Sequence, residues 1–320
     1  MRRNTTSRVS LTLLFSIVFL MLISGCVTIN SQPFGEFSIS VQELRKGADA
    51  ALHFNDEENR KWFLNKAAED IGNEGSGTAA ITGLAIKGEE FSWSMDPTPL
   101  FMTSKRFRKG VYRFNTVFMN YSELLESISA SELVDVKQFD KMAGDLNANM
   151  KSATKAMKVT VHEEAGEGMA IFSAAASAAA RIAVEHKRKN KLLEALQTNQ
   201  EQIKKLSLKL QEAILIATEN LWEIYEDHKR ILFKELVVVS KKSKAERKKR
   251  VEKFLKWNED FVYRLSVLES LHHAYGTLPN AHKELSEALK KPNLSLYSIR
   301  ELYEEGKHIY ALYKDLSKEE

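Results

Sequence analysis

Cysteine, proline and glycine are all scarce in this 320-residue chain, which contains one Cys, five Pro and 14 Gly. A single cysteine excludes an intramolecular disulfide framework and any zinc or iron–sulfur site built from several cysteines. No proline occurs between residues 100 and 278, and no glycine occurs from 169 to 275. Because these two residues most strongly interrupt helices, their absence favours long helices.

A strong excess of charge of one sign is also lacking. The formal net charge of +4 includes Arg2, Arg3 and Arg8, which precede the first apolar run. Without them, 44 basic residues stand against 43 acidic ones. A chain so close to neutral offers no overall attraction to nucleic acid, so we expect no nucleic-acid partner.

The N-terminus combines a basic head with a short apolar run over residues 9–23, interrupted only by Ser10, Thr12 and Ser16. A membrane-spanning helix needs about 20 apolar residues, so this run is short for a permanent anchor. Its length is typical of the apolar core of an export signal.

The apolar run ends in Leu22-Ile23-Ser24-Gly25-Cys26. This motif resembles the lipobox of bacterial lipoproteins, with Ile23 where leucine is more common. The resemblance implies cleavage between Gly25 and Cys26, diacylglyceryl attachment to the Cys26 sulfur and acylation, as with palmitate, of the new amino terminus. Residues 1–25 are then a signal peptide, and the mature chain is held in the bilayer by several acyl chains.

The residue after Cys26 indicates a location, and the uncharged stretch around it leaves one alternative. Val27 replaces the aspartate that retains lipoproteins in the inner membrane of enterobacterium-like cells, so the expected location is the periplasmic face of the outer membrane, in a cell that has one. An uncleaved signal anchor running past Cys26 is the alternative, because no charged residue occurs between Arg8 and Glu36.

The mature chain is expected to be all-α, an elongated bundle of long antiparallel helices over residues 37–320 on a tether at 26–36. A first helix is expected over about 37–71, with Asn55 or Asp56 capping a second part of it. Residues 72–96 contain five glycines and predict a loop, a short helix or a small hairpin. Pro97 and Pro99 then open a helix to about Ser129; its apolar face comprises Val111, Phe114, Phe118, Tyr121 and Leu125. Ser131 is expected to cap a further helix towards Val159.

The longest helix is predicted over residues 169–239, either unbroken or with a break near 187–191. Its apolar residues recur every seven positions, at Leu196, Ile203, Leu210, Ala217, Ile224, Ile231 and Val238. A second row, Leu192, Leu206, Ile214 and Leu221, makes the stripe broader than the seam of a simple dimeric coiled coil. This pattern favours packing against two or more neighbours, within the chain or in a homo-oligomer.

Residues 241–250 are expected to form the turn into a returning helix, capped by Ser240 or Ser243. The returning helix has a predicted buried face of Val251, Phe254, Leu255, Phe261, Val262, Leu265 and Leu268, and Gly276, Pro279 and Pro292 punctuate its end. A final helix is marked by Leu296, Ile299, Leu302, Ile309, Tyr313 and Leu316.

No catalytic constellation is recognisable, and we expect neither an enzyme nor a cofactor. G-x-S-x-G, Walker-type and H-E-x-x-H motifs are absent, and an acylated Cys26 cannot act as a nucleophile. Two Glu-x-x-His pairs, Glu269 with His272 and Glu305 with His308, have the spacing found in di-iron bundles. Such pairs also arise by chance among 33 Glu and eight His, so a metal-dependent enzyme is the least favoured hypothesis. His162-Glu163-Glu164 is interpreted as the acidic first turn of a helix.

Two segments are candidates for contact with other molecules. The basic run provides a contact patch for anionic headgroups, peptidoglycan carboxylates or an acidic protein; its members are Lys241, Lys242, Lys244, Arg247, Lys248, Lys249 and Arg250. Residues 166–184 are rich in alanine and uncharged from 168 to 180, which suits close helix packing or a membrane-penetrating element. The leading hypothesis is a non-catalytic envelope lipoprotein that acts as a scaffold or binds an envelope protein. A membrane-active helical protein is the alternative.

Overall fold

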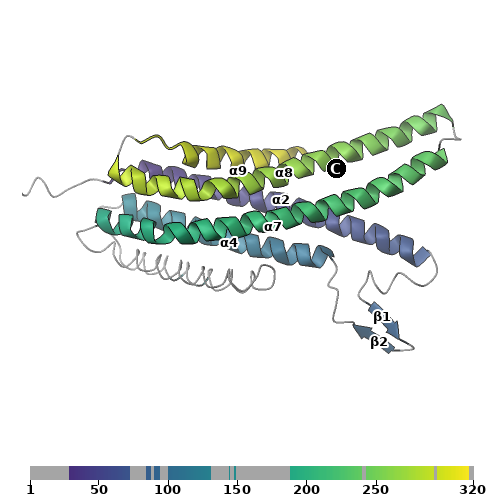
Figure 1. Ribbon diagram of the computed structural model, residues 1–320, viewed down its shortest axis with the longest axis horizontal. Coiled ribbons are helices and arrows are strands. Elements are labelled where there is room, and N and C mark those ends of the chain that lie inside the picture. Colours follow the sequence, from purple (N-terminus) through teal and green to yellow (C-terminus); the bar gives the residue numbers. More distant parts are fainter. Residues whose placement is uncertain are drawn as a thin grey trace, which may run out of the picture.

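The computed structural model describes residues 29–72, 84–87, 90–93, 100–130, 188–239, 243–291 and 294–316, with isolated positions 144 and 148. Its elements are α2 (Gln32–Gly72), β1 (Leu84–Lys87), β2 (Glu90–Trp93), α4 (Leu100–Ala130), α7 (Arg188–Val239), α8 (Lys244–Lys290) and α9 (Tyr297–Leu316). The long helices lie side by side in an elongated bundle, which confirms the all-α prediction (Figure 1). Within residues 72–96, β1 and β2 form an antiparallel hairpin that pairs Leu84 with Trp93, so the hairpin is the correct one of the three alternatives.

The helices run up and down, so that one end of the bundle collects several helix ends. The start of α2, the end of α4, the start of α7, the end of α8 and the start of α9 all lie there, and we call it the proximal end (Figure 1). At the opposite end, α7 and α8 leave the bundle together. We call residues 219–239 of α7 with residues 244–262 of α8 the distal arm (Figure 1).

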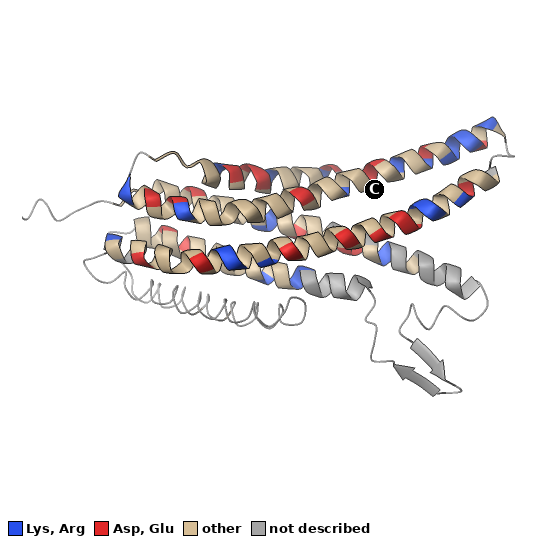
Figure 2. Ribbon diagram, viewed as in Figure 1, with Lys and Arg blue, Asp and Glu red and all other residues tan. Residues whose placement is uncertain are grey.

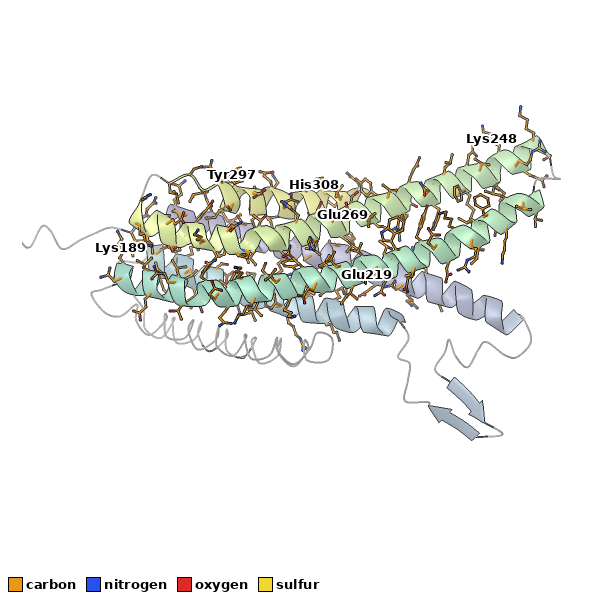
Figure 3. All side chains as sticks on the ribbon, in the orientation of Figure 1. Lys189, Glu219, Lys248, Glu269, Tyr297 and His308 are labelled. Atoms are coloured by element: carbon orange, nitrogen blue, oxygen red, sulfur yellow. The ribbon has the colours of Figure 1, made fainter. Side chains whose placement is uncertain are left out.

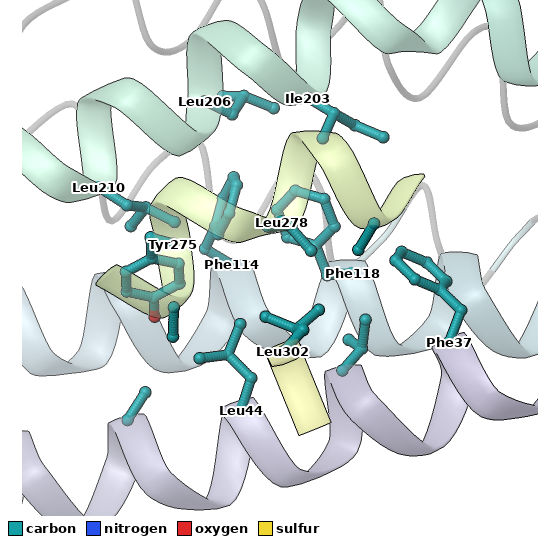
Figure 4. Close-up of a cluster of buried hydrophobic side chains, with 14 of the residues drawn as sticks. Phe37, Leu44, Phe114, Phe118, Ile203, Leu206, Leu210, Tyr275, Leu278 and Leu302 are labelled. Atoms are coloured by element: carbon teal, nitrogen blue, oxygen red, sulfur yellow. The ribbon is translucent and has the colours of Figure 1, made fainter. Parts of the chain in front are cut away.

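The core is made of large apolar side chains from every long helix. Phe37 and Leu44 of α2 meet Phe114 and Phe118 of α4, while α7, α8 and α9 close the cluster from the other sides (Figure 4). The predicted face of α4 is confirmed, since Val111, Phe114, Phe118, Tyr121 and Leu125 are all at most 2% exposed. Burial of about ten such side chains, each contributing about 2 kcal/mol, is the main force that holds the helices together.

Both apolar rows of α7 are buried where α7 lies in the bundle. Leu196, Ile203 and Leu210 of the first row are at most 1% exposed, and the second row of Leu192, Leu206, Ile214 and Leu221 is also buried. The prediction that α7 packs against more than one neighbour within the chain is therefore confirmed, because α7 contacts both α8 and α4.

The predicted tether boundary is wrong. Helix α2 begins at Gln32, five residues before the expected start at 37, and Phe34 is fully buried. Ile29 also packs against the core. The reason is that Phe34 and Phe37 are one helical turn apart and fill the same cluster, so the helix must begin early enough to present both. Only residues 26–31 then separate Cys26 from the bundle.

The expected cap inside the first helix is also wrong. Helix α2 is continuous through Asn55 and Asp56. Asn55 is buried, and the Asp56 carboxylate lies 3.1 Å from the Arg108 guanidinium of α4. Asp56 therefore serves a contact between α2 and α4, and neither residue begins a helix.

Gly276 and Pro279 do not end α8, which continues to Lys290. Proline has no N–H, so Pro279 leaves the carbonyl of Tyr275, four residues earlier, without its helical donor. The Ser207 hydroxyl of α7 donates a hydrogen bond to that carbonyl. Nearby, Gln200 donates to the Pro279 carbonyl at 2.9 Å and Gln211 donates to the His272 carbonyl at 3.2 Å. Polar residues of α7 thus stabilise the proline inside α8.

We expect Ser207→Ala to lower the free energy of unfolding by about 1.5 kcal/mol, because it leaves the buried Tyr275 carbonyl without a donor. Pro279→Ala restores a backbone N–H at that position, so the same serine replacement should cost much less in the Pro279→Ala background. Urea unfolding of the four chains of this cycle measures the coupling. Equal costs of Ser207→Ala in both backgrounds would contradict the assignment.

The final helix is confirmed by α9, with Leu296, Ile299, Leu302 and Ile309 buried. Its start is held by α8, because the Glu284 carboxylate accepts hydrogen bonds from the backbone N–H groups of Ser298 and Ile299 at 2.8 and 3.1 Å. A carboxylate at a helix N-terminus also complements the helix dipole. The end of α8 and the start of α9 are therefore joined at the proximal end.

Candidate functional site

The basic patch lies at the end of the distal arm, where the chain passes from α7 into α8. Ser243 is the N-cap of α8: its hydroxyl accepts from the Glu246 N–H, and Glu246 accepts in return from the Ser243 N–H, which confirms the predicted cap. These hydrogen bonds to the Glu246 carboxylate lower its pKa. The capping box therefore sets where α8 begins and presents its first turns to solvent.

The structure brings the predicted contact residues together on those turns. Five of them are exposed, namely Lys244, Arg247, Lys248, Lys249 and Arg250. Figure 2 shows the concentration of Lys and Arg at this end of α8, and Figure 3 shows Lys248 there. Lys241 and Lys242 lie outside the described residues.

Ion pairs fasten the two helices of the arm near its end. The Glu235 carboxylate of α7 accepts from the Arg250 guanidinium at 2.6 Å, and the Lys253 ammonium lies 4.0 Å from the same carboxylate. Lys248 pairs along its own helix with Glu252 at 3.5 Å. Arg250 is thus occupied in holding the arm together, whereas Lys244 and Lys249 are exposed.

Aromatic rings fill the single interface between the two helices. Tyr225 stacks on Trp257 at 4.7 Å between ring centroids and on Phe261 at 3.9 Å. Trp222 meets the edge of Phe261 at 4.9 Å, and the Tyr225 hydroxyl donates to Asn258 at 2.7 Å. Large flat rings bury much area per residue, so they can hold two helices together without a third.

Part of the predicted buried face of the returning helix is wrong. Val251, Leu255 and Val262 are 45%, 51% and 53% exposed, and Val238, the last residue of the α7 heptad row, is 70% exposed. Phe261 and Leu268 are buried as expected. The physical reason is that no third helix among the described residues covers the end of the arm: none of the described residues 243–260 is buried. Apolar periodicity cannot distinguish a residue that packs on a neighbour from one left in solvent.

A second candidate is a buried polar chain that joins α4, α7 and α8. Tyr121, Asn199 and His282 are fully buried. The His282 Nε2 lies 3.0 Å from the Tyr121 hydroxyl, and its Nδ1 lies 2.7 Å from the Gln200 Oε1. Since Gln200 donates through its Nε2 to the Pro279 carbonyl, its Oε1 must accept, which makes Nδ1 the donor and leaves Nε2 to accept from Tyr121.

Burial lowers the pKa of His282 to about 3 and raises the pKa of the Tyr121 hydroxyl. Both groups are therefore neutral near pH 7. A fully buried imidazole has no access to a substrate, so this chain of hydrogen bonds sets the register of three helices. The sequence pattern does not indicate this chain of hydrogen bonds, because its members are spread over residues 121–282.

A surface recess of about 450 Å³ lies between α2 and α4. Arg45 lies at its wall, donating to the Tyr112 hydroxyl at 2.6 Å and to the Met119 sulfur at 2.9 Å. Burial, and then the nearby Glu126 carboxylate, raises the pKa of Glu123 on the same wall. The Arg45 guanidinium is thus already engaged by its neighbours within the chain.

The two Glu-x-x-His pairs lie on different helices. Figure 3 shows Glu269 on α8 and His308 on α9. Between these two helices, His273 of α8 instead lies 3.2 Å from Glu305 of α9. Among the described residues, no group of three or more His, Cys, Asp or Glu side chains is placed to hold a metal ion.

Several predicted features lie outside the described residues: Gly25 and Cys26, the Ser131 helix, His162-Glu163-Glu164 and the alanine-rich segment 166–184. In the part of the chain that the structure describes, no helix has an apolar stretch long enough to cross a membrane.

Comparison with known proteins gives no relative. No family model, no curated protein and no solved structure matches this chain.

Proposed function

We propose that the chain is a bacterial envelope lipoprotein that acts as a non-catalytic helical scaffold. In this proposal, Cys26 carries the lipid, and the distal arm contacts another component of the envelope. The lipobox resemblance at residues 22–26 supports the anchor. The short connection of residues 26–31 then holds the proximal end of the bundle close to the bilayer surface.

The observation that carries the scaffold proposal is the position of the distal arm. Helix α2 starts at the proximal end, next to the proposed anchor, while the arm leaves the bundle at the other end (Figure 1). Helix α7 alone has 52 residues, which at about 1.5 Å per residue is roughly 75 Å. A rigid body of this length suits a spacer that presents a contact surface far from its anchor.

The exposed side chains of the arm support a contact role. Phe233, Val237, Val251 and Leu255 are 45–65% exposed at its end. Apolar side chains that gather on a protruding element, with basic residues beside them, are typical of an interaction surface. Two of the buried polar contacts, Asn115 with Tyr275 and Tyr121 with His282, are hydrogen bonds between helices, which suits a structural role for them.

The anchor is tested by the mass of the N-terminal peptide of the chain isolated from cell envelopes. We expect a peptide that begins at acylated Cys26, and we expect Cys26→Ser to abolish the acylation. A peptide that begins at Met1 would overturn the anchor.

The arm is tested by photo-cross-linking in cells, with a photoreactive residue in place of Leu255. The matched control places it at Leu208, an equally exposed apolar position of α7 within the bundle, at 50% exposure. We expect cross-linked protein or lipid from position 255 only. Equal cross-linking from both positions would overturn the contact role of the arm.

A further inference from the structure

The end of the distal arm holds the basic excess of the whole chain. Residues 233–256 contain ten Lys or Arg and three Asp or Glu. Outside this segment and residues 1–8, the chain has 34 basic and 40 acidic residues. The molecule is therefore polarised, with a positive arm end on an otherwise weakly negative body. Any partner that this end attracts by charge must be anionic.

The basic residues surround apolar side chains that are exposed rather than packed. Phe233, Val237 and Val238 at the end of α7 are 57%, 65% and 70% exposed, and Val251 and Leu255 of α8 are 45% and 51% exposed. Leaving five large apolar side chains in water is unfavourable. A partner that only neutralises charge, such as a soluble polyanion, would not cover them.

Four of these five apolar residues, all except Val238, share one face of the arm. On a helix that turns about 100° per residue, Phe233 and Val237 lie about 100° round α7 from Tyr225 and Leu232, which face α8. Val251, Leu255 and Val262 lie about 100° round α8 from Trp257 and Phe261, which face α7. Because the two helices are antiparallel, equal rotations bring both rows to the same side. Lys244 and Lys248 fall on the α8 row, so charge and apolar groups meet there.

We infer that this face binds the surface of an anionic phospholipid bilayer. Basic side chains would pair with the headgroup phosphates while the apolar side chains enter the boundary between headgroups and acyl chains. The surface lies on an element that protrudes from the bundle (Figure 1), which leaves it accessible to a flat bilayer. This inference rests on the proposed function, since the arm is the contact surface of the proposed scaffold. With the anchor at the proximal end, the molecule then joins two membrane surfaces.

The test uses the full chain with Cys26→Ser, which lacks the proposed acyl anchor, fixed to beads through a tag after Glu320, and labelled vesicles. Vesicles of phosphatidylcholine with about one third phosphatidylglycerol should be captured, whereas vesicles of phosphatidylcholine alone should not. The double variant Lys244→Glu with Lys248→Glu should weaken capture at least about tenfold, because basic residues near the surface dominate the attraction. Lys204→Glu with Lys205→Glu, at exposed positions of α7 in the bundle, is the control of equal charge and should leave capture unchanged.

A second pair of variants tests the apolar contribution. Val237→Ser with Leu255→Ser should weaken capture about fivefold, and Ile39→Ser with Leu208→Ser, both 50% exposed in the bundle, should not. Capture that ignores lipid charge, or that is insensitive to the arm variants, would overturn the inference. Retention of soluble peptidoglycan fragments or polyglutamate in place of vesicles, unaffected by the serine variants, would overturn it in favour of a soluble polyanion.

The bead assay is independent of the anchor, so the two proposals fail separately. Flotation of the untethered chain with neutral vesicles, compared with Cys26→Ser, reports the lipid anchor. Flotation without capture would leave the proposed anchor standing and end the bilayer inference. Capture without acylation at Cys26 would do the reverse.

Discussion

Replacing Gly306 with alanine is expected to lower the free energy of unfolding by about 2 to 3 kcal/mol, because the added methyl overpacks the contact between α2 and α9. A Cβ at residue 306 would lie 2.6 Å from the Leu44 nitrogen and 2.7 Å from the Glu43 carbonyl carbon. Gly47 faces it from α2, where a Cβ would lie 2.9 Å from the Gly306 oxygen. These neighbours are backbone atoms within helices, so the two helices would have to separate.

A loss of stability would be diagnostic of overpacking, since replacing glycine with alanine inside a helix ordinarily raises the free energy of unfolding by up to about 1 kcal/mol. Gly35, also in α2, is the matched control: its Cβ would meet only the flexible Glu126 side chain, at 3.4 Å. Gly35→Ala should therefore leave stability unchanged or raise it. Urea unfolding of both variants measures the contrast. A Gly306→Ala chain as stable as the parent would show that α9 does not lie this close to α2.

The helices could be predicted from the sequence because apolar periodicity and the lack of proline determine helix formation through residues that are close together in the chain. The face of α4 from Val111 to Leu125, both rows of α7 and the cap at Ser243 were predicted from spacing alone. The errors share one cause, which is that a neighbour distant in sequence overrides a local rule. Helix α8 continues through Pro279 because the Ser207 hydroxyl donates to the Tyr275 carbonyl, which lacks its helical donor. Helix α2 begins early because the Phe34 side chain is buried in the core.

The basic part of the candidate site was predicted from the sequence, whereas its exposed apolar part was not. A run of lysine and arginine between two helices is visible in the sequence, and the structure brings the described part of it to the end of the arm. The exposed apolar residues beside it were assigned to the core, since Val251 and Leu255 have the spacing of a buried face. Only the three-dimensional arrangement shows that the bundle ends before them. Because these apolar residues are exposed, the end of the arm presents both basic and apolar side chains to a partner.

Stability is expected to fall as the pH is lowered below about 6.5, and His282 is the main local cause. Burial holds the pKa of His282 near 3 in the folded chain, against an ordinary value of 6.5 in the unfolded chain. Between these values only the unfolded chain binds the proton, so acid favours unfolding by about 1.4 kcal/mol per pH unit. The loss from this one group between pH 7.5 and pH 4 is about 3 kcal/mol. Above pH 6.5 both states are neutral and the effect vanishes.

His282→Gln tests this assignment, because glutamine keeps polar atoms in the site and does not titrate. The variant should be less stable than the parent at pH 7.5, since it disturbs the contacts with Tyr121 and Gln200. Its free energy of unfolding should nevertheless fall less steeply between pH 6 and pH 4, with a slope smaller than that of the parent by about 1.4 kcal/mol per pH unit, the contribution of one proton. His308→Gln, at an exposed position of α9, controls for the loss of an imidazole. Parallel profiles of parent and His282→Gln would mean that His282 takes up its proton without unfolding, and that the buried chain from Tyr121 to Pro279 is not closed to water.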